Sequence, residues 1–203
     1  MNQKSIPKES YKDKKVTVMG LGLFGGGVGA AKFLVSQGAD VMVTDLKSAE
    51  ELSASLKLLN GLPVKFRLGE HSEEDFADAD MLIVNPAVPD DSRFLQIACD
   101  NNVQIDSELN IFFRLVPAPV IGITGSNGKS TTTSLLGEML KEAGIKTWVG
   151  GNIGVSLLEH LDEIRPDDVI VLEISSFQLE LLSRIEMSPH ISIVTNIAPN
   201  HLD

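Results

Sequence analysis

Seven consecutive residues near the middle of the chain have the types and the order that bind a nucleoside triphosphate. They run Gly-Ser-Asn-Gly-Lys-Ser-Thr from Gly125 to Thr131. An apolar run at 119–121 before them predicts a buried strand, and apolar residues at helical spacing predict a helix at 134–143 after them. Between a strand and a helix, glycines let backbone N–H groups converge on a phosphate, and the helix N-terminus adds partial positive charge. The pattern therefore predicts a phosphate-binding loop.

Two side chains of this loop have specific expected roles. Lys129 can reach the outer phosphates, and the Ser130 hydroxyl can bind the Mg²⁺ that accompanies them. The commonest form of the motif has a glycine five residues before Gly128, where this chain has Ile123. The alternative is a glycine-rich turn that binds nothing. The predicted ATP-binding residues are Gly125, Ser126, Asn127, Gly128, Lys129, Ser130 and Thr131.

A second glycine cluster lies near the start of the chain. Gly20, Gly22 and Gly25 follow an apolar run, and Asp45 lies 20 residues beyond the last of them. This is the dinucleotide fingerprint, in which the acid binds a ribose hydroxyl. Alone it predicts an NAD-dependent enzyme. The alternative is a similar fold that uses the same turn for another anionic ligand, such as a UDP diphosphate.

The elements around these motifs alternate between strand and helix. Alternation with short turns predicts an α/β protein with parallel sheets. The expected strands are 16–20, 40–44, 64–68, 81–84, 103–105, 119–121, 146–149, 169–174 and 191–195. The expected helices are 28–37, 49–59, 92–101, 108–115, 134–143 and 155–164.

We expect two domains. Residues 1–106 form a Rossmann-like domain, and residues 107–203 form a phosphate-loop NTPase-like α/β domain that is incomplete at its C-terminus. The last residues follow a strand with no closing helix, so we expect the sequence to be a fragment of a longer protein.

Composition narrows the classes of partner. The chain of 203 residues has a net charge of −11 and is 43% apolar. A negative charge disfavours nucleic acids and anionic membrane surfaces. A single cysteine, Cys99, fits a reducing compartment, and the polar, lysine-rich N-terminus predicts no signal peptide. We expect a cytoplasmic monomer with no membrane or nucleic-acid partner.

Four blocks of the chain together resemble the Mur ligase family, the ATP-dependent amide ligases that build the peptidoglycan precursor. The phosphate loop differs from the family's form only by Ser126 in place of threonine. The other blocks are Gly150–Gly154, Leu172–Glu180 and Thr195–Asp203. The block Glu-Ile-Ser-Ser-Phe-Gln-Leu-Glu, from Glu173, and the first glycine cluster are most similar to those of the D-glutamate-adding member.

The resemblance implies a two-step reaction. The carboxylate of UDP-N-acetylmuramoyl-L-alanine attacks the γ-phosphate of ATP to give an acyl phosphate, and the amine of D-glutamate then displaces phosphate. The implied cofactors are ATP and Mg²⁺, with Lys129, Glu173 and His201 as catalytic residues and Ser130, Glu173 and His201 at the metal ions. The implied substrate-binding residues are Gly22, Leu23, Phe24, Lys47, Asn152, Ser175 and Gln178.

Each of these roles has a simpler alternative. Glu173 could be a capping or surface acid, Ser175 a strand-end hydrogen bonder, and Asn152 a turn residue. Imidazole is a poorer ligand for Mg²⁺ than oxygen, so only the resemblance selects His201. His71, His160 and His190 have no partner pattern and are assigned no role.

The sequence also departs from the family. Phe24 and Leu46 replace hydroxyl residues, Lys47 replaces an arginine, and Asn85 replaces a serine, which weakens the assignment of the uridine site. The family's carbamylated lysine would lie beyond Asp203. Three alternative functions remain: a sister ligase for another amino acid, an NAD-binding module fused to an NTPase, and a non-catalytic nucleotide-binding fragment. We expect the 203 residues alone to lack turnover.

Overall fold

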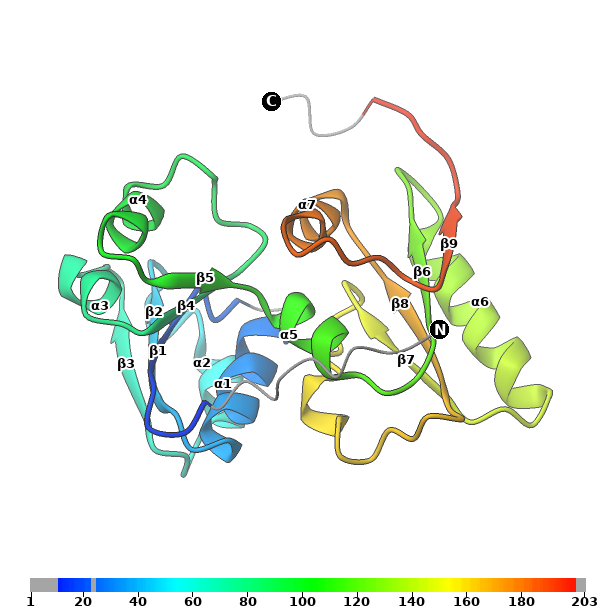
Figure 1. The fold of residues 1–203 in the computed structure, drawn as a ribbon, viewed down its shortest axis with the longest axis horizontal. Coiled ribbons are helices and arrows are strands. Elements are labelled where there is room, and N and C mark those ends of the chain that lie inside the picture. Colours follow the sequence, from blue (N-terminus) through cyan, green and yellow to red (C-terminus); the bar gives the residue numbers. More distant parts are fainter. Residues whose placement is uncertain (1–10, 23–24, 200–203) are drawn as a thin grey trace.

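Two parallel β-sheets, joined by one helix, make up the part of the protein that the structure describes (Figure 1). The structure is a computed structural model, and it describes residues 11–22 and 25–199. The predicted fold class, α/β with parallel sheets, is confirmed. The predicted division at 106/107 stays a prediction.

The first sheet has five strands in the order β3-β2-β1-β4-β5, all parallel. Its strands are β1 (Lys15–Met19), β2 (Asp40–Asp45), β3 (Val64–Leu68), β4 (Met81–Val84) and β5 (Gln104–Asp106). The helices between them are α1 (Gly26–Ser36), α2 (Ser53–Leu58), α3 (Glu73–Ala77) and α4 (Arg93–Asp100). This order places the glycine turn after β1 and Asp45, the last residue of β2, at the same edge of the sheet, since parallel strands end together.

The second sheet has four parallel strands in the order β7-β8-β6-β9. Its strands are β6 (Val120–Thr124), β7 (Thr147–Gly151), β8 (Val169–Glu173) and β9 (Ile191–Val194). Its helices are α6 (Lys129–Glu142), the 3₁₀ turn η1 (Leu158–His160) and α7 (Ser176–Arg184). The phosphate loop follows β6, which lies between β8 and β9, so both neighbouring strands end beside it.

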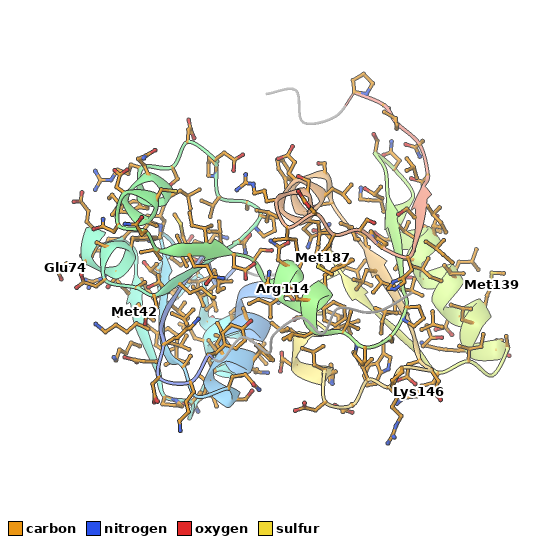
Figure 2. The ribbon with its side chains drawn as sticks, in the orientation of Figure 1. Met42, Glu74, Arg114, Met139, Lys146 and Met187 are labelled. Carbon is orange, nitrogen blue, oxygen red and sulfur yellow. The ribbon has the colours of Figure 1, made fainter. Side chains whose placement is uncertain are left out.

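Helix α5 (Glu108–Leu115) joins the two sheets. Leu109, Ile111 and Phe112 on this helix are buried in one apolar cluster that extends from Val16 of β1 to Ile170 of β8. Figure 2 shows Arg114 of the same helix between the sheets, where it forms an ion pair with the buried Asp106. The two sheets therefore share one continuous core.

The predicted helices differ from the structure in three ways. The predicted helix at 155–164 is wrong, because that segment contains only η1. Its buried leucines anchor an irregular loop against α1 and α5, so tertiary packing outweighs the helical spacing. Helices α3 and α7 were not predicted, and α6 begins at Lys129 rather than at residue 134.

No helix in the described part of the chain is long and apolar enough to cross a bilayer.

Candidate functional site

The loop between β6 and α6 has the shape of a phosphate cradle. Gly125 and Gly128 take φ angles of +133° and +81°, which side-chain-bearing residues rarely adopt. Gly128 is the N-cap of α6, and the first helical hydrogen bond after it runs from the Thr132 N–H to the Gly128 carbonyl. The N–H groups of the first turn precede that bond, so they have no partner within the helix and suit an anion.

Lys129 folds back over this loop. Its Nζ donates hydrogen bonds to the carbonyl oxygens of Gly125 at 2.8 Å and Ser126 at 3.3 Å. The ammonium group therefore lies against the loop, where the outer phosphates of a nucleotide would be bound. Ser130 and Thr131, in the first turn of α6, are exposed.

The segment Thr195–Ala198, here called the strap, holds the loop from the side of β9. Asn196 accepts a hydrogen bond from the Ser126 N–H at 3.0 Å and, through Oδ1, from the Asn127 N–H at 3.1 Å. The Ser126 hydroxyl donates to the Ala198 carbonyl at 2.9 Å. A Cβ at Gly125 would lie 2.2 Å from Thr195 Oγ1, so only glycine allows this contact. The sequence motifs predict no role for Thr195 or Asn196.

An acidic centre lies on the strand next to the loop. Glu173 ends β8, and its neighbour across the β6–β8 pairing is Ile123, two residues before Gly125. Its side chain is 3% exposed, and Oε1 accepts a hydrogen bond from Asn152 Nδ2 at 3.0 Å. Its Oε2 is buried and has no hydrogen-bond partner among the described residues. A buried carboxylate oxygen without a partner is unfavourable unless a ligand or ion satisfies it.

This donor set fits Mg²⁺. Carboxylate and hydroxyl oxygens are the ligands that this ion prefers, and it keeps several waters of its own. No group of three His, Cys, Asp or Glu side chains that could hold a metal ion lies within residues 11–22 and 25–199. The described protein therefore offers Glu173 and the Ser130 hydroxyl, and the nucleotide's phosphates would have to supply further ligands.

Two predicted substrate-binding residues have a structural role as well. Ser175 is the N-cap of α7, and its hydroxyl oxygen accepts from the Gln178 N–H at 3.3 Å. Gln178 Oε1 in turn accepts from the Ser175 N–H at 2.9 Å, which completes a capping box. The Ser175 hydroxyl proton and the Gln178 amide NH₂ are the groups that these two bonds leave for a substrate.

The glycine turn of the first sheet is held from inside by Asp45. Its Oδ2 accepts from the N–H groups of Leu21 at 2.9 Å and Gly22 at 3.3 Å, and its Oδ1 accepts from the Lys47 N–H at 2.9 Å. The carboxylate is thus engaged by the main chain, and Asp45 is 8% exposed. The Lys47 side chain is exposed beside it. The predicted sites Leu23, Phe24 and His201 lie outside the described residues.

A cavity of about 300 Å³ opens beside this turn. Its lining includes Asp45, Leu46, His71, Arg93 and Phe94. His71 lies 2.7 Å from Thr44 Oγ1, and its burial lowers its pKa against the opposing influence of nearby carboxylates. No local motif predicts a role for His71, because its neighbours Thr44, Phe76 and Phe94 come from three different segments.

A smaller cavity, of about 40 Å³, lies between the two sheets. It brings Gln178 of α7 together with Gly20, Asn85 and Glu108. The structure thus joins one predicted site residue of the second sheet to the glycine turn of the first. Gly125 to Thr131, Asn152 and Glu173 are gathered at the carboxyl edge of the second sheet.

Glu108 lies where α5, α1 and the loop before η1 meet. The Ser156 hydroxyl donates to Glu108 Oε1 at 2.6 Å, and a Cβ at Gly29 would lie 2.3 Å from Ser156 Oγ. Burial raises the pKa of Glu108 from its ordinary 4.5 to about 7, although the Ser156 hydrogen bond opposes this rise. The carboxyl is therefore largely protonated at pH 6 in the folded protein.

We predict that Glu108→Gln removes a pH-dependent loss of stability. Between pH 4.5 and about 7 the unfolded chain ionises Glu108 while the folded protein keeps it protonated, so stability falls as pH rises through this range. Above pH 7.5 the variant should be more stable than wild type by about 3 kcal/mol. Below pH 4.5 the variant and the wild type should have the same stability.

Thermal unfolding of wild type and variant from pH 4 to 8 measures this difference. Glu138→Gln is the matched control. Glu138 is exposed, and it forms an ion pair with Lys141 on the same helix. If the difference in stability between Glu108→Gln and wild type were the same at pH 4.5 and at pH 8, the raised pKa of Glu108 would be contradicted.

Known proteins are similar to this chain along most of its length. Residues 14–107 match the model of the Mur ligase MurD-like N-terminal domain, and residues 123–203 match that of the Mur ligase middle domain. The UDP-N-acetylmuramoylalanine–D-glutamate ligase of Roseiflexus sp. (strain RS-1) is 52% identical over 190 residues, which cover 94% of this chain and 41% of that protein. The protein of the same name from Acetivibrio thermocellus is 39% identical, over 97% of this chain and 41% of that protein.

Solved structures show the same arrangement. The UDP-N-acetylmuramate-alanine ligase MurC from Thermotoga maritima matches with a TM-score of 0.57 and 26% identity, over 93% of this chain and 43% of that one. The chain thus spans about 41% of the length of the curated relatives it matches.

Proposed function

Because this chain belongs to the Mur ligase family, we propose that the full-length protein carrying it is an ATP-dependent ligase. It joins D-glutamate to UDP-N-acetylmuramoyl-L-alanine through an acyl phosphate, in cytoplasmic synthesis of the peptidoglycan precursor. The specific substrates are those in the names of the relatives at 52% and 39% identity. The monomeric state and the lack of nucleic-acid and membrane partners stay predictions.

The observation that carries this proposal is the pairing of a phosphate loop with a buried acid. Lys129 lies against the loop, and Glu173 Oε2, which has no hydrogen-bond partner within the described part of the chain, lies on the adjacent strand. This arrangement suits transfer of a phosphoryl group, since that chemistry depends on positioning and on neutralising charge. Mg²⁺, when bound, would neutralise charge on the phosphates.

The residues at the carboxyl edge of the second sheet would bind ATP and Mg²⁺. Gly125 to Thr131 would bind the phosphates of ATP, Lys129 would stabilise the transferring group, and Ser130 and Glu173 would hold Mg²⁺. Asn152 orients Glu173 through its amide NH₂, which leaves its Oδ1 for substrate. His201 remains a predicted ligand of a second Mg²⁺.

The UDP-substrate would lie across the edges of both sheets. Gly22, the exposed Lys47 and the predicted residues Leu23 and Phe24 would hold the diphosphate. The cavity beside Asp45 and Phe94 has room for a base. Gln178, which the small cavity joins to the glycine turn, and Ser175 would contact the muramoyl-alanine end.

An NAD-dependent enzyme is the alternative from another class. Its fingerprint requires the acid after the second strand to bind a ribose hydroxyl. In this protein Asp45 already accepts three main-chain hydrogen bonds and is buried. The geometry of Asp45 therefore favours a turn-stabilising role over NAD binding.

Phosphate release by the full-length protein with Mg·ATP tests the proposal. Release should depend on both UDP-N-acetylmuramoyl-L-alanine and D-glutamate. Release with another amino acid would move the assignment to a sister ligase. No release with any amino acid, together with tight binding of NADH, would replace the proposal by the NAD-dependent alternative.

A further inference from the structure

One residue of the strap contacts both sides of Asn127 in the phosphate loop. Asn196 Oδ1 accepts a hydrogen bond from the Asn127 N–H at 3.1 Å, and Asn196 Nδ2 donates to the Asn127 carbonyl at 2.8 Å. Its own carbonyl accepts from the Ser126 N–H at 3.0 Å. The Thr195 hydroxyl adds a second donor to the Asn127 carbonyl, at 2.6 Å. The N–H groups of Ser126 and Asn127 and the carbonyl of Asn127 thus face the strap.

The geometry of the peptide group determines which main-chain groups face the other side of the loop. In a trans peptide the C=O and the following N–H point in opposite directions, and no cis peptide occurs among the described residues. Since the N–H groups of Ser126 and Asn127 face the strap, the carbonyls of Gly125 and Ser126 face away from it. Lys129 Nζ is bonded to these same two carbonyls.

The next peptide has the reverse orientation. The Asn127 carbonyl faces the strap, so the Gly128 N–H faces the side on which Lys129 lies. This N–H is the first of the donors at the N-terminus of α6, and Gly128, with φ of +81°, accommodates the reversal. The direction of this peptide decides whether the loop offers a donor or a carbonyl to a phosphate.

We propose that Asn196 is a positioning residue of the phosphate loop. Its side-chain amide sets the orientation of the Asn127–Gly128 peptide, and so aims the Gly128 N–H and the Lys129 ammonium at the phosphates of ATP. The identity of the nucleotide rests on the proposed function. The contacts of Asn196 lie 69 to 70 residues away in sequence, at a site where both Asn127 and Asn196 are exposed. Exposed hydrogen bonds contribute little to stability, so their main effect should be on the loop's conformation.

Two substitutions in the full-length protein separate positioning from folding. Asn196→Asp keeps the size and the acceptor for the Asn127 N–H, but it places a carboxylate oxygen against the Asn127 carbonyl. That repulsion should turn the peptide, and the added charge opposes phosphate. We expect the dissociation constant of Mg·ATP, measured by calorimetry, to rise about 50-fold in Asn196→Asp and about 10-fold in Asn196→Ala. The melting temperature should change by less than about 3 °C in either variant.

Two further variants serve as controls. Thr195→Val removes the second donor but keeps Asn196, so ATP binding should weaken by only about 3-fold. Asn110→Ala removes a buried hydrogen bond to the Leu181 carbonyl at 3.2 Å. It should lower the melting temperature without changing the affinity of the folded protein for ATP.

Wild-type affinity in Asn196→Asp, or a loss no larger than that in Asn110→Ala, would overturn the inference. The calorimetry needs neither the UDP-substrate nor an amino acid. A wild type that binds ATP but releases no phosphate with any amino acid would therefore reject the ligase while leaving the effect of Asn196 measurable. A wild type that binds no ATP would overturn both.

Discussion

Lys129→Ala should reduce the phosphate release of the full-length protein by about 10³-fold, a loss typical of removing a group that stabilises charge only in the transition state. The ammonium of Lys129 lies on the phosphate side of the loop, bonded to the carbonyls of Gly125 and Ser126. Under the proposed function, the same group would turn toward the transferring phosphoryl oxygens of ATP. Its removal leaves the loop without its only side-chain cation.

The fold should survive this substitution. Lys129 is half-buried at the surface, and its two hydrogen bonds are to loop carbonyls that water can reach. Lys141→Ala, at the other end of α6, is the control, because Lys141 pairs with Glu138 far along the helix from the loop. Near wild-type turnover in Lys129→Ala would show that the loop is not the site of phosphoryl transfer.

Glu173→Gln should lower turnover by about 10²-fold and raise the Mg²⁺ concentration needed for half-maximal rate. Glutamine has nearly the shape of glutamate and can still accept from Asn152 Nδ2, as Oε1 does at 3.0 Å. It cannot supply a charged oxygen at the position of Oε2, for which residues 11–22 and 25–199 provide no hydrogen-bond partner. The loss should therefore appear in the magnesium dependence more than in the binding of UDP-substrate.

Titration of the rate with Mg²⁺ at saturating substrates measures this effect. Glu180→Gln is the matched control, since Glu180 is an exposed acid on the next element, α7. If Glu173→Gln had the same magnesium dependence as wild type, Glu173 would not be a ligand of the metal and would have only a structural role beside Asn152.

The parts that could be predicted from the sequence are those encoded by local spacing. The glycines, Lys129 and the flanking strand and helix are adjacent in the chain, so the phosphate loop follows from one motif. Glu173 lies at the end of an apolar run, which predicts its place at the carboxyl edge of a sheet. The capping box of Ser175 and Gln178 also has a local signal, a serine followed three residues later by glutamine. This signal predicts the start of α7.

The parts that could not be predicted depend on contacts between distant segments. The strap lies about 70 residues from the loop that it holds, and its asparagine gives no local signal of a partner. Asp45 fits the spacing of a ribose-binding acid, yet its position next to the turn engages it with main-chain donors. The leucines of 155–164 have helical spacing, but the shared core fixes them in a loop.

The shared core around α5 also couples the stability of the two sheets. Because Leu109, Ile111 and Phe112 contact one apolar cluster that reaches both, neither sheet can melt without exposing the same side chains. Cooperative unfolding of the described residues makes the fraction of intact nucleotide site depend on positions far from it. A cavity made at Val16 or Leu34 would thus reduce ATP binding in proportion to the population that unfolds, with no change in the affinity of the molecules that stay folded.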